Sequence, residues 1–241
     1  MKVAAWQAPL LPSGSMEALP LIRERIAECE RRGVEVLCCP EAILGGLADY
    51  APEPGALAID AEGGELERVL QPLGSDRVST VVGFTDAGPG GRLYCSAAVF
   101  QEGAVTGVYR KTHPAIRRSV YSAGDRTPVF DSNGLRFGIV VCYDSNFREP
   151  ARTICSRGAS VLFIPTNNGL PPEKADVVPR ARRAQAERAV ENRVHVVAAD
   201  VAGRCGDHVS WGSSGVTAPD GTLLAAAEPL AEELLVVDLD G

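Results

Sequence analysis

The chain lacks the features that mark several large protein classes. Its 24 Lys and Arg residues are outnumbered by 31 Asp and Glu residues, which gives a formal net charge of -7. Because nucleic-acid affinity depends largely on Lys and Arg neutralising phosphates, this balance argues against nucleic acid and anionic membranes as partners. No segment approaches the roughly 20 consecutive apolar residues that cross a bilayer. Residues 1–7 reach Pro9 and Pro12 without the charged-then-apolar pattern of a signal peptide.

The cysteines also lack a recognisable pairing pattern. The 7 cysteines are an odd number and include no Cys-x-x-Cys pair. This usage argues against a disulfide framework and against a structural zinc site. We therefore expect a reducing cytoplasm as the location, and neither a metal nor a cofactor.

What the chain has is enough apolar sequence for one sizeable core. It contains 241 residues, of which 45% are hydrophobic. An α/β fold of this length is often one domain, so we expect a single domain over residues 1–241. We find no internal repeat, low-complexity tract or long linker.

Strand and helix patterns alternate along the chain. Apolar residues at helical spacing predict a helix over 19–29, with Gly33 as its stop signal. Glu102-Gly103 is a plausible hairpin turn, and Pro219-Asp220-Gly221 should separate strands near Gly215 and Leu234. The remaining expected strands are 34–39, 78–84, 93–100, 104–109, 135–141, 161–164 and 194–199, and the remaining helices are 148–157 and 180–191. This order predicts a layered α/β architecture.

Three chemically useful side chains follow expected strands. Glu41 comes after strand 34–39, Lys111 after strand 104–109, and Cys142 directly after strand 135–141. Taken singly, the cysteine is more often a small core residue, and the two charges are more often solvated loop residues. Together, however, they can supply a general base, an electrostatic stabiliser and a nucleophile. The carboxyl ends of strands are also where active sites of open α/β sheets collect.

The residues around these positions resemble a known family. Cys39-Pro40-Glu41, Tyr109-Arg110-Lys111-Thr112-His113-Pro114 and Val140-Val141-Cys142-Tyr143-Asp144 resemble, in order, the three signatures of the nitrilase, or carbon–nitrogen hydrolase, superfamily. The likeness continues in Phe147-Arg148-Glu149, Ile164-Pro165-Thr166-Asn167, residues 181–192 and Gly212-Ser213-Ser214-Gly215. It thus covers nearly the whole chain.

The resemblance implies a fold and a chemistry. The fold would be a four-layer α-β-β-α sandwich that forms a homodimer or a higher homo-oligomer. Cys142 would attack a small amide, Glu41 would accept the thiol proton, and Lys111 with the backbone N–H of Tyr143 would hold the oxyanion. Asn167 is a candidate substrate contact, although an amide in that place can equally cap its own turn. His113 and His195 are more often structural residues.

One departure from the family pattern stands out. Many relatives carry a second glutamate shortly after the lysine, whereas Arg117-Arg118-Ser119 occupies that region here and no acidic residue occurs between Lys111 and Asp125. The arginines could bind an acidic substrate group, but an adjacent pair is more often a solvated surface feature.

Several functions remain open at this point. An amidase is our first expectation, an N-carbamoyl-amide hydrolase the second and a nitrilase the third, because Cys142-Tyr143-Asp144 resembles amidase branches. A papain-like Cys–His enzyme would leave Glu41 and Lys111 unexplained. A non-catalytic binding protein on the same fold would account for the missing glutamate but not for the retained triad. The substrate pocket should be built from loops around Asp49, Tyr50, Arg117, Tyr121, Ser145 and Asn167.

Overall fold

A computed structural model describes residues 1–115, 118–174 and 177–239 of the chain, and their strands form two β-sheets. The path of the first sheet is β12-β11-β1-β2-β4-β5-β6, with β15 paired to β1 and β3 paired to β4. The strands of this sheet are β1 (Lys2–Pro9), β2 (Val36–Cys38), β3 (Ala58–Ile59), β4 (Ser79–Ala87), β5 (Leu93–Gln101), β6 (Ala104–Arg110), β11 (Val201–Cys205), β12 (His208–Ser210) and β15 (Glu233–Asp238).

The second sheet has parallel strands at its centre and antiparallel strands at its edges. Its order is β14-β13-β10-β9-β8-β7, in which β8, β9 and β10 run parallel. The strands are β7 (Val129–Ser132), β8 (Leu135–Ile139), β9 (Val161–Pro165), β10 (His195–Ala199), β13 (Gly215–Thr217) and β14 (Leu223–Ala226).

Strand β1 shows how the layers are held together. Successive side chains of a strand point to opposite faces. Val3 and Ala5 belong to the core between the two sheets, whereas Ala4 and Trp6 belong to a second core that includes helix residues such as Ile22. Both faces of β1 are therefore buried, which explains its nearly continuous apolar sequence.

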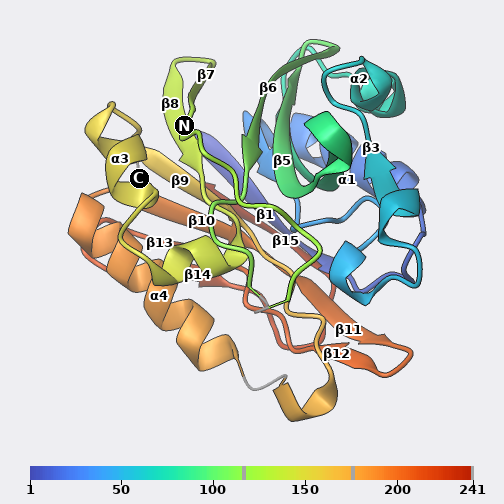
Figure 1. Ribbon diagram of the computed structural model, residues 1–241. Helices are drawn as coiled ribbons and strands as arrows, with labels where there is room; N and C mark the ends of the chain where they lie inside the picture. Colours follow the sequence, from blue (N-terminus) through green and yellow to red (C-terminus); the bar gives the residue numbers. More distant parts are fainter. Residues whose placement is uncertain (116–117, 175–176, 240–241) are drawn as a thin grey trace.

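Helices cover the outer face of each sheet. Helices α1 (Ala18–Arg32) and α2 (Glu65–Leu70) pack on the first sheet, and α3 (Ala151–Ser156) and α4 (Val178–Asn192) pack on the second. Figure 1 shows the two helix pairs on opposite sides of the paired sheets. The expected four-layer α-β-β-α sandwich is confirmed.

Several local expectations are confirmed. Helix α1 ends where Gly33 adopts a left-handed conformation (φ 70°) and caps it with its N–H. The hairpin between β5 and β6 turns at Glu102 and Gly103, whose φ angles of 51° and 80° suit a turn of type I′.

Other local expectations are wrong. The Pro219-Asp220-Gly221 turn joins β13 to the unexpected strand β14, whereas β15 pairs with β1 in the other sheet. After the short 3-10 turn η5 (Cys142–Asn146), residues 147–150 form a bend and a turn, and helix α3 spans only Ala151–Ser156 within the expected 148–157, with Pro150 at its N-cap.

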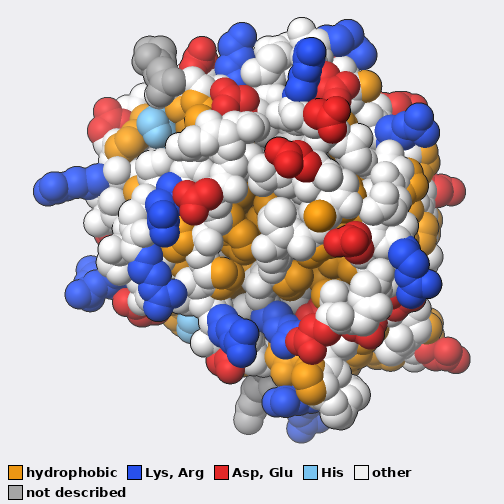
Figure 2. All heavy atoms as spheres, turned by 90° about the horizontal axis from the view of Figure 1, so that it is seen from above, with side chains coloured by type: hydrophobic (Ala, Val, Ile, Leu, Met, Phe, Trp, Pro, Cys, Tyr) orange, Lys and Arg blue, Asp and Glu red, His pale blue; other side chains and the backbone are white. Residues whose placement is uncertain are grey.

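The surface carries charges of both signs. Figure 2 shows Lys and Arg side chains interspersed with Asp and Glu side chains around apolar side chains near the centre of this face. This face therefore has no broad patch of a single charge. In the part of the chain that the structure describes, no helix has the length and apolar character needed to cross a membrane.

Candidate active site

Glu41 lies just past the end of β2 and is held by the loop that follows β9. Its side chain is buried, and its Oε2 accepts a hydrogen bond from the backbone N–H of Asn167 at 3.1 Å. Its own backbone N–H donates to the carbonyl of Thr166 at 3.2 Å. A Cβ on Gly83 of β4 would come within 2.3 Å of the Pro40 carbonyl, so only glycine leaves room for this segment. The position of the carboxylate is thus fixed from two strands.

Lys111 follows the last residue of β6 and pairs directly with Glu41. Its Nζ lies 2.5 Å from Glu41 Oε1, and both side chains are almost fully buried. Burial alone would lower the pKa of Lys111, but the acidic groups around it, the Glu41 carboxylate first among them, together outweigh that effect and hold the pKa well above its ordinary value. Lys111 is therefore an ammonium throughout the neutral range.

Cys142 begins η5, beyond the end of β8, in a left-handed conformation. Its φ of 45° is unusual for a residue with a Cβ and costs roughly 1–3 kcal/mol. Burial raises the pKa of its thiol above the ordinary value and Glu41 raises it further, while Lys111 and a backbone hydrogen bond from Asn167 lower it. The net direction is upward, so the resting sulfur is a thiol. The lowering effect of the neighbouring Lys111 ammonium is thus outweighed by burial and by Glu41.

A buried carboxylate, Asp144, locks the Cys142 turn to the Lys111 segment. Its Oδ2 accepts hydrogen bonds from the Tyr109 hydroxyl (2.7 Å) and the Val141 N–H (3.1 Å). Its Oδ1 accepts them from the Thr112 hydroxyl and the His113 N–H, both at 2.8 Å. Because Tyr109, Thr112 and His113 flank Lys111, Asp144 fixes the ammonium relative to the thiol.

Helix α4 supports the same turn from the other side. The Ser145 hydroxyl donates to the Cys142 carbonyl at 2.7 Å, and Arg188 Nη1 donates to the Ser145 carbonyl at 2.9 Å. Arg188 is almost fully buried, and its Nη2 pairs with Glu191 at 2.9 Å. The turn that contains Cys142 is therefore held in place by hydrogen bonds to the outer helix α4.

A second buried aspartate, Asp200, organises the far wall of the site. It accepts hydrogen bonds from the Asn168 N–H (3.0 Å), from Asn168 Nδ2 (2.8 Å) and from both the N–H and the hydroxyl of Ser213 (2.9 and 2.7 Å). Burial raises the pKa of Asp200, and these hydrogen bonds oppose that rise. Asp200 thus ties the loop after β9 to the Gly-Ser-Ser loop before β13.

Glu41, Lys111 and Cys142 all line one cavity of about 560 Å³. Its size suits a small organic molecule. Of the loop residues expected around the pocket, Asp49, Tyr50, Tyr121, Ser145 and Asn167 line the cavity, whereas Arg117 lies outside the described residues.

One of these expected residues, Asp49, brings a second carboxylate to the cavity wall. Asp49 belongs to the 3-10 turn η1 (Ala48–Tyr50) and accepts hydrogen bonds from the Ser119 hydroxyl at 2.9 Å and the Val120 N–H at 2.8 Å. Ser119 belongs to the region where many relatives carry the second glutamate. An acidic side chain therefore reaches this part of the cavity from another loop.

Tyr143 and Asn167, the expected substrate contacts, both line the cavity but differ in their surroundings. The Tyr143 side chain is exposed and packs edge-on against Phe147. The side chain of Asn167 is engaged within the protein, since its Nδ2 donates to the Glu41 carbonyl at 3.2 Å and its Oδ1 accepts from the Gly169 N–H at 3.0 Å. This favours the turn-capping interpretation of the Asn167 side chain.

The histidines do not support a Cys–His mechanism. Within residues 1–115, 118–174 and 177–239, no histidine is among the side chains that line the cavity beside Cys142. His113 instead stacks on Phe147, with 4.0 Å between ring centroids, and places Nδ1 3.0 Å from Asp144. Every cysteine lies in the described part of the chain and is a free thiol.

Sequence reasoning missed Asp144, Asp200, Arg188 and Cys95, which donates its S–H to Glu41 Oε1 at 3.1 Å. Asp144 had one local signal, because a carboxylate three residues after Val141 can reach back to the backbone N–H that begins a helical turn. The other three contacts join segments distant in sequence and have no local pattern.

The fold is a layered α/β sandwich, and a thiol, an ammonium and a carboxylate line one of its cavities. This combination is typical of a class of hydrolases. Within that class the chain belongs to the carbon–nitrogen hydrolase family, whose model matches residues 2–241. It is therefore a hydrolase that acts on non-peptide C–N bonds.

Individual relatives agree with this assignment. The chain is 30% identical to the hydrolase in the pqqF 5′ region of Pseudomonas protegens over 100% of this chain and 83% of that protein. It is 31% identical to a nitrilase of Pyrococcus abyssi over 89% of this chain and 80% of the other. An (R)-stereoselective amidase of Pseudomonas sp. is 30% identical over 86% and 74% of the two chains.

Solved structures give the same result. A mutant of the Nesterenkonia sp. AN1 amidase, from the nitrilase superfamily, superposes with a TM-score of 0.83 at 27% identity, over 99% of this chain and 90% of that one. Another structure of that amidase shows the Michael addition of acrylamide at its active site cysteine, with a TM-score of 0.82 at 27% identity over 99% and 93% of the two chains.

Proposed function

We propose that the chain hydrolyses a small amide through a thioester on Cys142, with Glu41 as the proton carrier and Lys111 as the oxyanion stabiliser. The observation that carries this proposal is the buried Lys111–Glu41 ion pair, 2.5 Å from Nζ to Oε1, in the wall of the cavity that Cys142 also lines. Burying two charges costs free energy. A buried ammonium–carboxylate pair beside a thiol is therefore typical of a functional site rather than of a purely structural contact.

The first half of the reaction forms the thioester. Glu41 takes the proton of the Cys142 thiol while the sulfur attacks the amide carbon. The developing oxyanion lies against Lys111 Nζ and the backbone N–H of Tyr143. As the tetrahedral intermediate collapses, the C–N bond breaks and Glu41 returns the proton to the departing nitrogen, which leaves as ammonia.

The second half releases the acid. Glu41 takes a proton from water, the resulting hydroxide attacks the thioester carbon, and the C–S bond breaks. The sulfur recovers its proton from Glu41, so that amide and water have become carboxylic acid and ammonia. The raised pKa of the Cys142 thiol supports this role for Glu41, because a protonated sulfur needs a base at the moment of attack.

Two kinds of comparison favour an amide substrate. The relatives include an (R)-stereoselective amidase and the human omega-amidase NIT2, which is 28% identical over 89% of this chain and 80% of that protein. The related solved structures include several of one amidase. A nitrile is the second candidate, because the Pyrococcus abyssi nitrilase is similarly related.

The test is a screen for ammonia release across small primary amides, ureido acids and nitriles, with Cys142→Ala as the matched control. We expect release from at least one primary amide that the control lacks. Release from nitriles alone, or equal release by the control, would refute the amidase assignment.

A further inference from the structure

A second, smaller cavity adjoins the one that contains Cys142. Its volume is about 150 Å³, and its walls come from the chain after β1, from the residues that follow Glu41 and from the β11–β12 hairpin. Leu47, Tyr50 and Asn167 line both cavities. The two cavities therefore adjoin at these three side chains.

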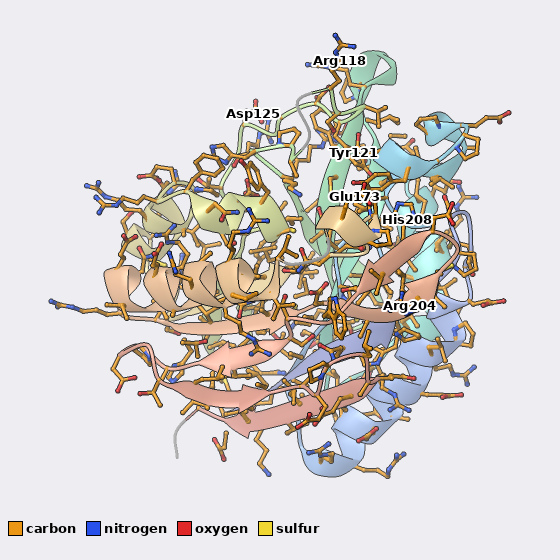
Figure 3. All side chains as sticks on the ribbon, turned by 90° about the horizontal axis from the view of Figure 1, so that it is seen from below. Arg118, Tyr121, Asp125, Glu173, Arg204 and His208 are labelled. Atoms are coloured by element: carbon orange, nitrogen blue, oxygen red, sulfur yellow. The ribbon has the colours of Figure 1, made fainter. Side chains whose placement is uncertain are left out.

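The wall between the cavities is a fixed part of the fold. Asn167 lines both cavities, Gly169 lines only the small one and Leu170 lines only the large one. Leu170 pairs with Val209 through two backbone hydrogen bonds of 3.1 and 2.9 Å, which ties the wall to β12. In Figure 3, Glu173 lies between Tyr121, which lines the large cavity, and His208, which lines the small one.

The chemistry of the two cavities differs. The described residues that line the small cavity include no Asp, Glu, Lys or Arg, and six of the thirteen are aliphatic, with Leu10, Leu11 and Ile43 among them. Tyr50 and His208 add aromatic surface, in edge-to-face contact at 4.9 Å. The large cavity, by contrast, has Asp49, Glu173 and Arg180 in its wall beside the Glu41–Lys111 pair. A charged group would lose its hydration in the small cavity without finding a counter-charge.

We propose that the small cavity binds an uncharged apolar substituent on the acyl group of the substrate, so that the preferred amide carries a short alkyl chain or a phenyl ring. The acyl group is assigned to it because ammonia, the other product, has no such substituent. A cavity of about 150 Å³ is large enough for a molecule the size of benzene. This inference rests on the proposed amide hydrolysis.

Binding is the first test, because it does not depend on turnover. Calorimetric titration of the Cys142→Ala variant with linear primary amides should show about fourfold tighter binding for each added methylene until the small cavity is full. Amides of equal length that end in a carboxylate or an ammonium should not gain. Affinity that stays flat along the uncharged series would overturn the proposal.

A matched pair of leucine variants locates the effect. Leu11 and Leu21 are both partly buried and pack against the same core, but only Leu11 lines the small cavity. Leu11→Trp, made in the Cys142→Ala background, should abolish the gain from longer chains and leave acetamide binding unchanged, whereas Leu21→Trp should change neither. Leu11→Ala, which enlarges the cavity, should move the optimum to a longer chain. An equal loss of affinity for all amides in Leu11→Trp would refute the assigned location.

Kinetics with the enzyme that retains Cys142 distinguish a failure of this inference from a failure of the proposed function. If kcat/KM follows the same chain-length series, both stand. If short amides are hydrolysed but chain length has no effect, the apolar subsite is wrong and the amidase assignment survives. If longer amides bind progressively better but none is hydrolysed, the subsite stands and amide hydrolysis fails.

Discussion

Replacing Glu41 with glutamine should make Cys142 more reactive toward alkylating agents while it abolishes amide hydrolysis. The Glu41 carboxylate raises the pKa of the Cys142 thiol, and Lys111 lowers it. The same carboxylate is the chief counter-charge that keeps Lys111 protonated, with Cys142 next in order. Once residue 41 is neutral, the buried ammonium has the thiolate as its nearest remaining partner. The negative charge should then move from the carboxylate to the sulfur.

The expected size follows from the compactness of the site. Glu41 Oε1 lies 2.5 Å from Lys111 Nζ and 3.1 Å from Cys95 Sγ, and Cys142 lines the same cavity. Two unit charges about 4 Å apart interact by about 4 kcal/mol at an effective dielectric constant of about 20. One third of that energy, about 1.4 kcal/mol, lowers the thiol pKa by about one unit and raises the thiolate fraction about tenfold. Hydrolysis should fall by about 10²–10⁴-fold through loss of the base.

The assay measures both quantities on the same preparations. Iodoacetamide labelling of the Cys142 peptide is followed by mass spectrometry from about pH 7 to about pH 9, and ammonia release is measured in parallel. In the unmodified enzyme the labelling rate should rise across this range, because the raised pKa keeps the sulfur protonated. In Glu41→Gln the curve should shift to lower pH, with labelling about tenfold faster near neutrality.

Two controls and one outcome test whether the charge of Glu41 suppresses the reactivity of Cys142. Glu173→Gln removes an exposed carboxylate that lines the same cavity and should change neither rate. Cys95 also has a pKa that burial and Glu41 raise, but it is fully buried, so its peptide should stay unlabelled. If alkylation in Glu41→Gln slows together with hydrolysis, Glu41 activates the sulfur in the resting enzyme and the charge argument is refuted.

Three further predictions concern positioning. Cys142→Ala should abolish ammonia release and leave the melting temperature nearly unchanged, and a loss of more than a few degrees would contradict this. Asp144→Asn places an amide N–H against hydrogen-bond donors. It should lower the free energy of unfolding, measured in urea, by about 3–5 kcal/mol and should also lower kcat. A change below about 1 kcal/mol would show that the hydrogen bonds to Asp144 are dispensable. Gly83→Ala should displace the Glu41 segment and reduce kcat, whereas Gly55→Ala, with open space around its Cβ position, should not.

Much of the fold could be predicted because its signals are local. Apolar residues at helical spacing and a glycine stop defined α1, and Glu102-Gly103 supplied the turn of the β5–β6 hairpin. The positions of Glu41, Lys111 and Cys142 just beyond strands followed from apolar runs that end before them. Glu41 and Lys111 follow strands of the first sheet and Cys142 follows a strand of the second, so the packing of the two sheets brings the three residues to one cavity.

Other features depend on contacts between distant segments. Strand β14 contains Leu223-Leu224-Ala225-Ala226 with little alternation, and its pairing with β13 is visible only in three dimensions. The partners of Asp200 come from two loops, and nothing in their spacing indicates that they meet. The net direction of the thiol pKa could not be predicted from sequence, since a neighbouring cation can be inferred from a motif but the extent of burial cannot.

The contacts of Glu41 make the carboxylate, rather than the sulfur, the fixed point of the site. Segments from three other strands hold it: Lys111 after β6, Cys95 within β5, and Thr166 with Asn167 at the end of β9. In the proposed mechanism, a thiol that stays protonated beside such a base reacts fastest when a carbonyl carbon is in reach and Lys111 has an oxyanion to stabilise. Stray electrophiles that cannot develop an oxyanion gain nothing from Lys111. We therefore expect the raised thiol pKa to favour substrates that use the whole site over simple alkylating agents.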